Sequence, residues 1–280
     1  MGTTIADFRL LGLLGSGGIG HVYIASPTLA AASDRRFALK LLRPELAHRP
    51  DIIHRFEREA MAAARVRHEN VLEVHRPVTV LQNARFFTME VLVGLDLADT
   101  LAYTGRLTVD RAVRIVRGVA RGLSAAHAAG VVHRDVKPEN VFLVHEPDGS
   151  EVVKVLDFGA AWIVGETSPG GRRITSRAAV VGTPEYMAPE QLDGAEGHPC
   201  ADVYALGVVL FELLVGKVPF SGSTWQELAH VKSTSSLPNV PHVSSALAAL
   251  VRRALAPSPS DRFGSADELL RAIEASTEAR

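Results

Sequence analysis

The chain has 280 residues, 47% of them hydrophobic, which is enough to bury a sizeable core in one large domain or two modest ones. A formal net charge of -1 argues against a nucleic-acid partner and against a polybasic membrane-binding surface. The lone cysteine, Cys200, excludes an internal disulfide. With no signal peptide and no apolar run of bilayer length, we expect a cytoplasmic protein without a membrane segment.

Short apolar runs in residues 1–93 predict a strand-rich lobe. A helical pattern opens at Pro50, where apolar side chains recur three and four positions apart. The predicted strands cover residues 8–14, 22–25, 37–42, 71–80 and 85–91. We therefore expect a five-stranded antiparallel sheet and one helix in this lobe.

Residues 94–280 predict a mainly helical lobe. Thr108 is the expected N-cap of a long amphipathic helix that Gly130 ends, and the glycine-rich residues 168–173 predict a mobile loop. Short strands are predicted at 131–132, 141–144 and 152–156, with a turn at 147–149. The expected fold class is α+β, with two lobes in one domain over residues 1–280. A cleft between lobes is a favoured small-molecule site.

A glycine cluster follows the first predicted strand. Gly15, Gly17 and Gly20 fall in the spacing G-x-G-x-x-G-x-V, which Val22 completes. Glycine lets a backbone fold over phosphate groups and present its N–H groups to them. Dinucleotide-binding folds share the spacing but continue into a helix, whereas residues 22–25 continue as a strand. The motif favours a phosphate-binding hairpin, and an ordinary glycine-rich hairpin is the alternative.

Lys40 stands alone in the apolar strand 37–42. A charge buried there needs a partner, and we expect the phosphates of ATP and the carboxylate of Glu59 on the following helix. Glu57 points about 200° away from Glu59 around that helix, so only one of the two can face Lys40. An exposed lysine on an edge strand is the alternative.

The segment from His133 to Asn140 matches H-R-D-x-K-P-x-N at every specified position. Asp135 is expected to accept the proton of a substrate hydroxyl, and Asn140 to bind a metal ion. Lys137 is expected to steady the transferred phosphoryl charge, while His133 holds backbone in the core.

Two later motifs complete this chemistry. In Asp157-Phe158-Gly159, Asp157 is expected to chelate Mg²⁺ and Phe158 to pack inward. Residues 182–190 carry two prolines that stiffen a platform on which a peptide substrate can lie.

Three further residues are expected to hold the helical lobe together. Glu190 ends the platform as a buried carboxylate that needs a cation, and Arg262 is the candidate partner. Asp202 is most simply the cap of the helix that follows it.

These motifs resemble the eukaryotic-like (Hanks-type) Ser/Thr protein kinases, in their bacterial branch, over residues 8–273. The resemblance implies a non-specific Ser/Thr protein kinase. Such an enzyme transfers the γ-phosphoryl group of ATP to Ser/Thr hydroxyls of proteins and autophosphorylates its activation loop. It also implies Mg²⁺, for which Mn²⁺ can substitute. Lys137 and Thr183 fit the Ser/Thr pattern and not the Tyr pattern.

The resemblance also implies how ATP is held. Met89 corresponds to the gatekeeper residue, and the backbones of Glu90 and Leu92 to the hinge that hydrogen bonds adenine. Leu143 is expected below the adenine ring and Ala38 above it. The full ATP-binding set is Gly15, Ser16, Gly17, Gly18, Ile19, Gly20, Val22, Ala38, Lys40, Met89, Glu90, Leu92 and Leu143.

Regulation is implied by the same resemblance. Arg134, beside the catalytic aspartate, is expected to grip a phosphate on the activation loop. Thr175 is the expected phosphorylation site and Ser176 the second candidate, because Arg177 occupies the place of a usual second site. Thr183 is expected to be a fixed contact to the catalytic residues.

The sequence is compatible with more than one extent, partner and function of the protein. A stand-alone kinase and an excised kinase domain both fit, as do a homodimer and a phosphopeptide-binding partner. A pseudokinase scaffold is one alternative, although such chains usually lack Lys40, Asp135 or Asp157, and this chain has all three. A small-molecule kinase of the aminoglycoside type is another, although those enzymes lack the platform of residues 182–190.

Overall fold

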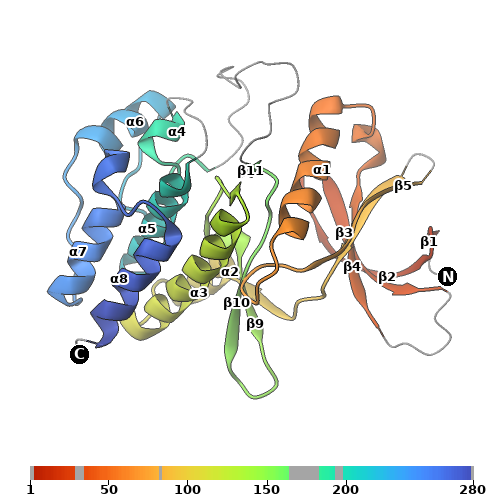
Figure 1. Ribbon diagram of the computed structural model, residues 1–280, viewed down its shortest axis with the longest axis horizontal. Coiled ribbons are helices and arrows are strands. Elements are labelled where there is room, and N and C mark those ends of the chain that lie inside the picture. Colours follow the sequence, from red (N-terminus) through yellow and green to blue (C-terminus); the bar gives the residue numbers. More distant parts are fainter. Residues whose placement is uncertain (1–2, 29–34, 82–83, 164–182, 193–197, 279–280) are drawn as a thin grey trace.

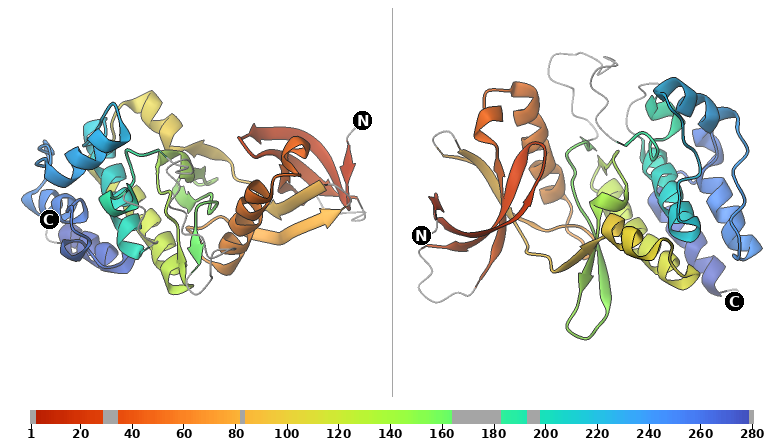
Figure 2. Two further views of the ribbon diagram at one scale, coloured as in Figure 1. Left: turned by 90° about the horizontal axis from the view of Figure 1, so that it is seen from above. Right: turned by 180° about the vertical axis from the view of Figure 1, so that it is seen from behind.

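The computed structural model describes residues 3–28, 35–81, 84–163, 183–192 and 198–278. It has a strand-rich N-terminal lobe beside a helical C-terminal lobe, seen at the right and left of Figure 1 and from two further sides in Figure 2. The predicted fold class is therefore confirmed. The predicted loop 168–173 and the candidate phosphorylation sites Thr175 and Ser176 lie outside the described residues.

In the described part of the N-terminal lobe, six strands rather than five form one antiparallel sheet. In spatial order they are β1 (Thr4–Ile5), β2 (Phe8–Ser16), β3 (Gly20–Pro27), β4 (Phe37–Leu42), β6 (Ala84–Met89) and β5 (Val74–Leu81). The two-residue β1 is too short to leave an alternating pattern in the sequence. β5 begins later than predicted, because Val71 forms a parallel bridge with Val155 instead.

The predicted helix is α1 (Pro50–Arg65), with proline at its first position, where no hydrogen bond is lost. Its inner face buries Phe56, Glu59 and Ala60. The ring of Phe56 lies 5.2 Å from that of Phe87 in β6, so an aromatic pair fixes the helix on the sheet.

Two long helices form the base of the C-terminal lobe. α3 (Val109–Ala128) begins at Thr108, whose hydroxyl accepts from the backbone N–H of Arg111, and the chain leaves it at Gly130 with φ 73°. α5 (Pro199–Val215) is buried over almost its whole length. The remaining described helices are α2 (Leu97–Thr104), α4 (Pro189–Leu192), α6 (Trp225–Thr234), α7 (Ser245–Ala254) and α8 (Ala266–Glu278). None of the helices described is both long and apolar enough to cross a bilayer.

Two small sheets lie where the lobes meet (Figure 1). One contains β10 (Glu151–Val155), β9 (Val141–His145) and β7 (Gly94–Asp96), and the other pairs β11 (Trp162–Ile163) with β8 (Val131–Val132). β9 and β10 form a hairpin around the predicted turn, which the bond from Gly149 N to Glu146 O closes.

The segment after α1 ties the lobes together. The side chain of Asn70 donates to Val153 O at 2.8 Å, and Asn70 O accepts from Val155 N at 2.9 Å. This close approach needs a glycine in α3, because a Cβ at Gly122 would lie 2.6 Å from Asn70 O.

We therefore predict that Gly122→Ala destabilises the protein, although alanine is the better helix former. The contact with Asn70 O is to backbone, which cannot turn aside, so we expect a loss of about 1–3 kcal/mol in the free energy of unfolding. Urea unfolding followed by circular dichroism measures it. Gly264→Ala is the control, because a Cβ there meets only Glu268 Oε2 at 3.6 Å. Equal unfolding midpoints for the two variants would contradict the prediction.

Candidate active site

A buried ion pair joins the sheet to α1. Lys40 Nζ donates to Glu59 Oε1, and only 15% and 8% of the two side chains are exposed. Burial alone would lower the pKa of Lys40, but the carboxylates of Glu59 and Asp157 outweigh burial and raise it. The lysine is therefore a fixed positive charge that faces the cleft side of the sheet.

The glycine hairpin is fastened at its tip. Gly17 N donates to Gly20 O at 2.9 Å, and the guanidinium of Arg43 donates twice to Gly17 O, at 3.1 and 2.9 Å. Arg43 also donates to Ser16 Oγ at 3.2 Å. A Cβ at Gly20 would lie 2.6 Å from Leu41 O, so only glycine fits there. No pattern in the sequence marked Arg43.

Residues 133–140, which we call the catalytic loop, bring Asp135, Lys137 and Asn140 together at the 3₁₀ turn Pro138–Asn140. Asp135 Oδ2 accepts from Lys137 Nζ at 2.9 Å and from Asn140 Nδ2 at 3.2 Å. Asn140 Nδ2 also donates to Asp135 O at 2.7 Å, so the amide nitrogen is committed. The amide oxygen of Asn140 is thereby left as its ligand for a hard cation.

Asp157 and Phe158 lie beside that loop, because Leu156 N donates to Asn140 O at 2.8 Å. Asp157 has a left-handed φ of 52°, and its Oδ1 accepts from Gly159 N at 2.9 Å. Burial would raise the pKa of Asp157, but the charge of Lys40 and the Gly159 N–H outweigh burial and lower it. Phe158 is buried with its ring 4.7 Å from that of His133, as inward packing requires.

Asp202 does not cap a helix, contrary to the prediction. α5 begins at Pro199 with His198 as its cap, and Asp202 lies inside the helix, fully buried. Its carboxylate accepts from the backbone N–H groups of His133 and Arg134 at 2.9 and 2.7 Å. It therefore anchors the catalytic loop. The predicted helix is present, but it begins three residues before Asp202.

A histidine completes the anchor. His127 Nε2 donates to Asp202 Oδ2 at 2.8 Å. Burial would raise the pKa of Asp202, but the bond from His127 and the loop N–H groups lower it. Nothing in the sequence motifs marked His127, because its bond to Asp202 forms only where α3 meets α5 in the fold.

The platform after residue 182 is joined to the lobe by the predicted ion pair. Arg262 Nη1 and Nη2 donate to the two oxygens of Glu190 at 2.7 and 2.8 Å, with the arginine side chain 0% exposed. Arg262 donates further to Ala256 O and Pro257 O at 2.6 and 2.7 Å. Contact of Thr183 with the catalytic residues stays a prediction.

An apolar cluster in the N-terminal lobe matches most of the expected adenine surface. Ala38 and Met89 are cross-strand partners, and Val22, Leu92 and Leu156 pack against them. Leu156 was not among the expected residues.

Leu143 does not belong to that surface. It is 0% exposed inside the core of the C-terminal lobe. Neighbouring residues of a strand point to opposite faces, so the half-buried Phe142 faces away from this core. The expectation for Leu143 was wrong by one position in β9.

The expected hinge is held at Glu90. Its backbone N–H donates to Glu73 O at 3.0 Å, so only its carbonyl can serve adenine. Its side chain accepts from Lys154 Nζ at 2.7 Å, which ties the hinge to β10.

Among the described residues, no group of three or more His, Cys, Asp or Glu is placed to hold a metal ion. Mg²⁺ in a nucleotide site takes one or two carboxylates and completes its shell with phosphates and water. Asn140 and Asp157 offer the oxygen atoms that such an ion prefers.

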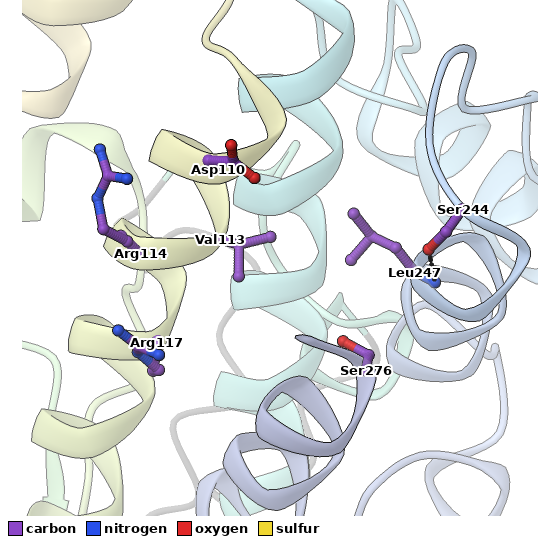
Figure 3. Close-up of a pocket in the computed structure, with 7 residues that line it drawn as sticks. All are labelled: Asp110, Val113, Arg114, Arg117, Ser244, Leu247 and Ser276. Atoms are coloured by element: carbon purple, nitrogen blue, oxygen red, sulfur yellow. Dashed lines mark hydrogen bonds between the residues drawn. The ribbon is translucent and has the colours of Figure 1, made fainter. Parts of the chain in front are cut away.

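A separate pocket lies within the C-terminal lobe, between α3, α7 and α8 (Figure 3). It is lined by Asp110, Val113, Arg114, Arg117, Ser244, Leu247 and Ser276. None of the residues that carry phosphoryl-transfer chemistry in the sequence motifs lines it. The candidate active site is therefore defined by the motif residues themselves, with Lys40 and Glu59 in one lobe and Asp135, Asn140 and Asp157 in the other.

The glycine hairpin, the buried Lys40–Glu59 pair, Asp135 and Asp157 are the features that the kinase-like sequence motifs predicted. A model of the protein kinase domain matches residues 8–272. Serine/threonine-protein kinase pkn3 of Myxococcus xanthus is 38% identical over 98% of this chain and 51% of its own length. PknB of Mycobacterium tuberculosis is 34% identical over 94% of this chain and 41% of its own length.

The chain therefore belongs to the protein kinase domain family, in its bacterial Ser/Thr branch. It spans about half, or less, of the length of these curated relatives.

We predict that Arg262→Met destabilises the protein by about 3–5 kcal/mol, because it leaves Glu190 without its buried cation. The same change at Arg271, whose pair with Asp267 is largely exposed, is the control and should cost less than about 1 kcal/mol. Thermal and urea unfolding measure both. A similar loss in the two variants would contradict the buried pair's importance.

Proposed function

We propose that the chain is an active Ser/Thr protein kinase that transfers the γ-phosphoryl group of Mg-ATP to hydroxyls of protein substrates. The observation that supports this most is the link between the two lobes at Asp157: the charge of Lys40 lowers its pKa. The residue before it, Leu156, donates to Asn140 O at 2.8 Å, and Asn140 is bonded to Asp135. The matched relatives carry the name Ser/Thr-protein kinase.

Each group has a distinct task in this proposal. Lys40, held by Glu59, binds the α- and β-phosphates, and the glycine hairpin covers them. Asp135 orients the acceptor hydroxyl and takes its proton, while Lys137, 2.9 Å away, compensates charge on the moving phosphoryl group. Mg²⁺ bound to Asn140 and Asp157 would neutralise phosphate charge.

We include residues 1–280 as one catalytic domain and autophosphorylation in the proposal. Arg134 supports this: burial and the like charge of Arg58 in α1 lower the pKa of its guanidinium, although the carboxylate of Asp202 acts against them. Two cations that influence each other in this way favour an added anion, as a phosphate on Thr175 or Ser176 would supply. The pseudokinase alternative has no comparable support, since the chain has Lys40, Asp135 and Asp157, one of which such proteins usually lack.

We predict that Asp135→Asn lowers turnover at least about 10²-fold, because the amide keeps the shape but cannot take the proton. Folding and ATP binding should stay nearly unchanged. Intact mass spectrometry after incubation with Mg-ATP measures it, as gains of about 80 Da for each phosphoryl group in the unmodified sequence only. Normal turnover in this variant would contradict the role of Asp135 as the group that accepts the proton.

We also predict that the double variant Thr175→Ala, Ser176→Ala loses the phosphate that the unmodified chain places on its activation loop. Peptide mapping by mass spectrometry after the same incubation locates the modified residues. An unchanged phosphate count would reject both sites while leaving the kinase proposal intact.

A further inference from the structure

A fully buried lysine contacts the platform from beneath. Lys232 lies near the end of α6 and is 1% exposed. Its ammonium donates to Pro184 O at 2.9 Å, to Glu185 O at 2.8 Å and to Met187 O at 2.5 Å. An ammonium has three N–H donors, so all of them are spent on backbone carbonyls of one short loop.

This arrangement fixes the shape of the loop. Carbonyl dipoles that converge on one point repel each other unless a cation lies between them. The local turns are weak by comparison, because Tyr186 N and Met187 N lie 3.2 and 3.3 Å from their carbonyl acceptors. On the other side the Tyr186 hydroxyl donates to Glu212 Oε2 of α5 at 2.6 Å. Side chains of both α5 and α6 therefore bind this loop.

The surroundings do not favour the charge that the loop needs. Burial lowers the pKa of Lys232 to about 7, Arg262 acts in the same direction, and the carboxylates of Glu185 and Glu190 act against them. Lys232 Nζ and the Arg262 guanidinium also lie over the same ring, Tyr204, at 5.4 and 4.8 Å. The charged and titratable groups that act on Lys232 are therefore Arg262, Glu185 and Glu190, with the ring of Tyr204 beneath it.

A lowered pKa has a defined sign for stability. Between about pH 7 and the ordinary range of lysine, the unfolded chain binds a proton that the folded chain does not, so stability rises with pH there. Holding the ammonium charged therefore reduces the stability of the folded protein. Lys232 therefore does not contribute through its charge to the stability of the fold. Because all three of its N–H donors bind carbonyls of residues 184–187, we infer that its role is to hold the shape of that loop.

We propose that Lys232 is a positioning residue for the protein substrate, because its ammonium fixes the carbonyls of residues 184–187, which carry the acceptor segment. The inference rests on the proposed kinase function. α6 lies at the far side of the C-terminal lobe from α1 and the sheet (Figure 1), so the nucleotide site should not depend on it.

The test uses Lys232→Met, which keeps the length of the side chain and removes the charge. With histone as the acceptor protein, we expect the KM for histone to rise at least about tenfold. The KM for ATP, and the rate of ATP hydrolysis without histone, should stay within about twofold. Lys217→Met, at an exposed lysine, is the matched control and should change neither value.

Two results would overturn the proposal. One is an unchanged KM for histone in Lys232→Met, and the other is a parallel change in the ATP and histone values, which a general structural role produces. If the unmodified chain transfers no phosphate to histone or to itself, the kinase function fails instead. The two failures are therefore distinguishable.

A pH profile decides the matter where Lys232→Met fails to fold. In the unmodified chain, the KM for histone should rise as the pH passes about 7, because the ammonium loses a donor. In Lys232→Arg the guanidinium stays charged, so that rise should flatten while the KM for ATP keeps one profile in both. The same slope for histone in both proteins, or an arginine variant that cannot bind histone at any pH, would count against the proposal.

Discussion

The carboxylate of Asp202 is the constraint on which the catalytic half of the structure depends. It lies in the first turn of the most apolar helix described, α5, and a buried charge there is tolerated only when donors surround it. Two of those donors are backbone N–H groups of the catalytic loop, so the loop cannot shift without exposing the charge. The position of Asp135 follows, and Phe158 then stacks on the fixed ring of His133.

Among the described residues, the buried cations Lys40, Arg262 and Lys232 are satisfied in three different ways. Lys40 has a carboxylate, Arg262 has a bidentate carboxylate with added carbonyls, and Lys232 donates its hydrogen bonds to carbonyls alone. The first pair joins the sheet to a helix, and the second joins the platform to the segment between α7 and α8. Lys232 has no hydrogen-bonded carboxylate to offset its burial, and its pKa therefore falls to about 7. Its bonds to carbonyls hold the shape of the backbone instead.

Much of this structure could be predicted from short-range sequence patterns. The rest depends on contacts between segments that are distant in the sequence. The pairing of Lys40 with Glu59 followed from helix periodicity, and that of Glu190 with Arg262 from the need of a buried carboxylate for a cation. The tasks of His127 and Lys232 could not be predicted, because each depends on helices that meet only in the folded chain. Leu143 was misplaced because a one-residue error in a strand exchanges its two faces.

The bond network around Arg43 makes the glycine hairpin and the lysine strand a single mechanical unit. Arg43 follows β4 directly, three positions after Lys40, and it grips the hairpin at Gly17. A tilt of the hairpin is therefore transmitted along β4 to the lysine and, through Glu59, to α1. Under the proposed function, the hairpin that covers the nucleotide and the Lys40–Glu59 ion pair would therefore move together. Nucleotide exchange would then involve the hairpin, β4 and α1 as a unit.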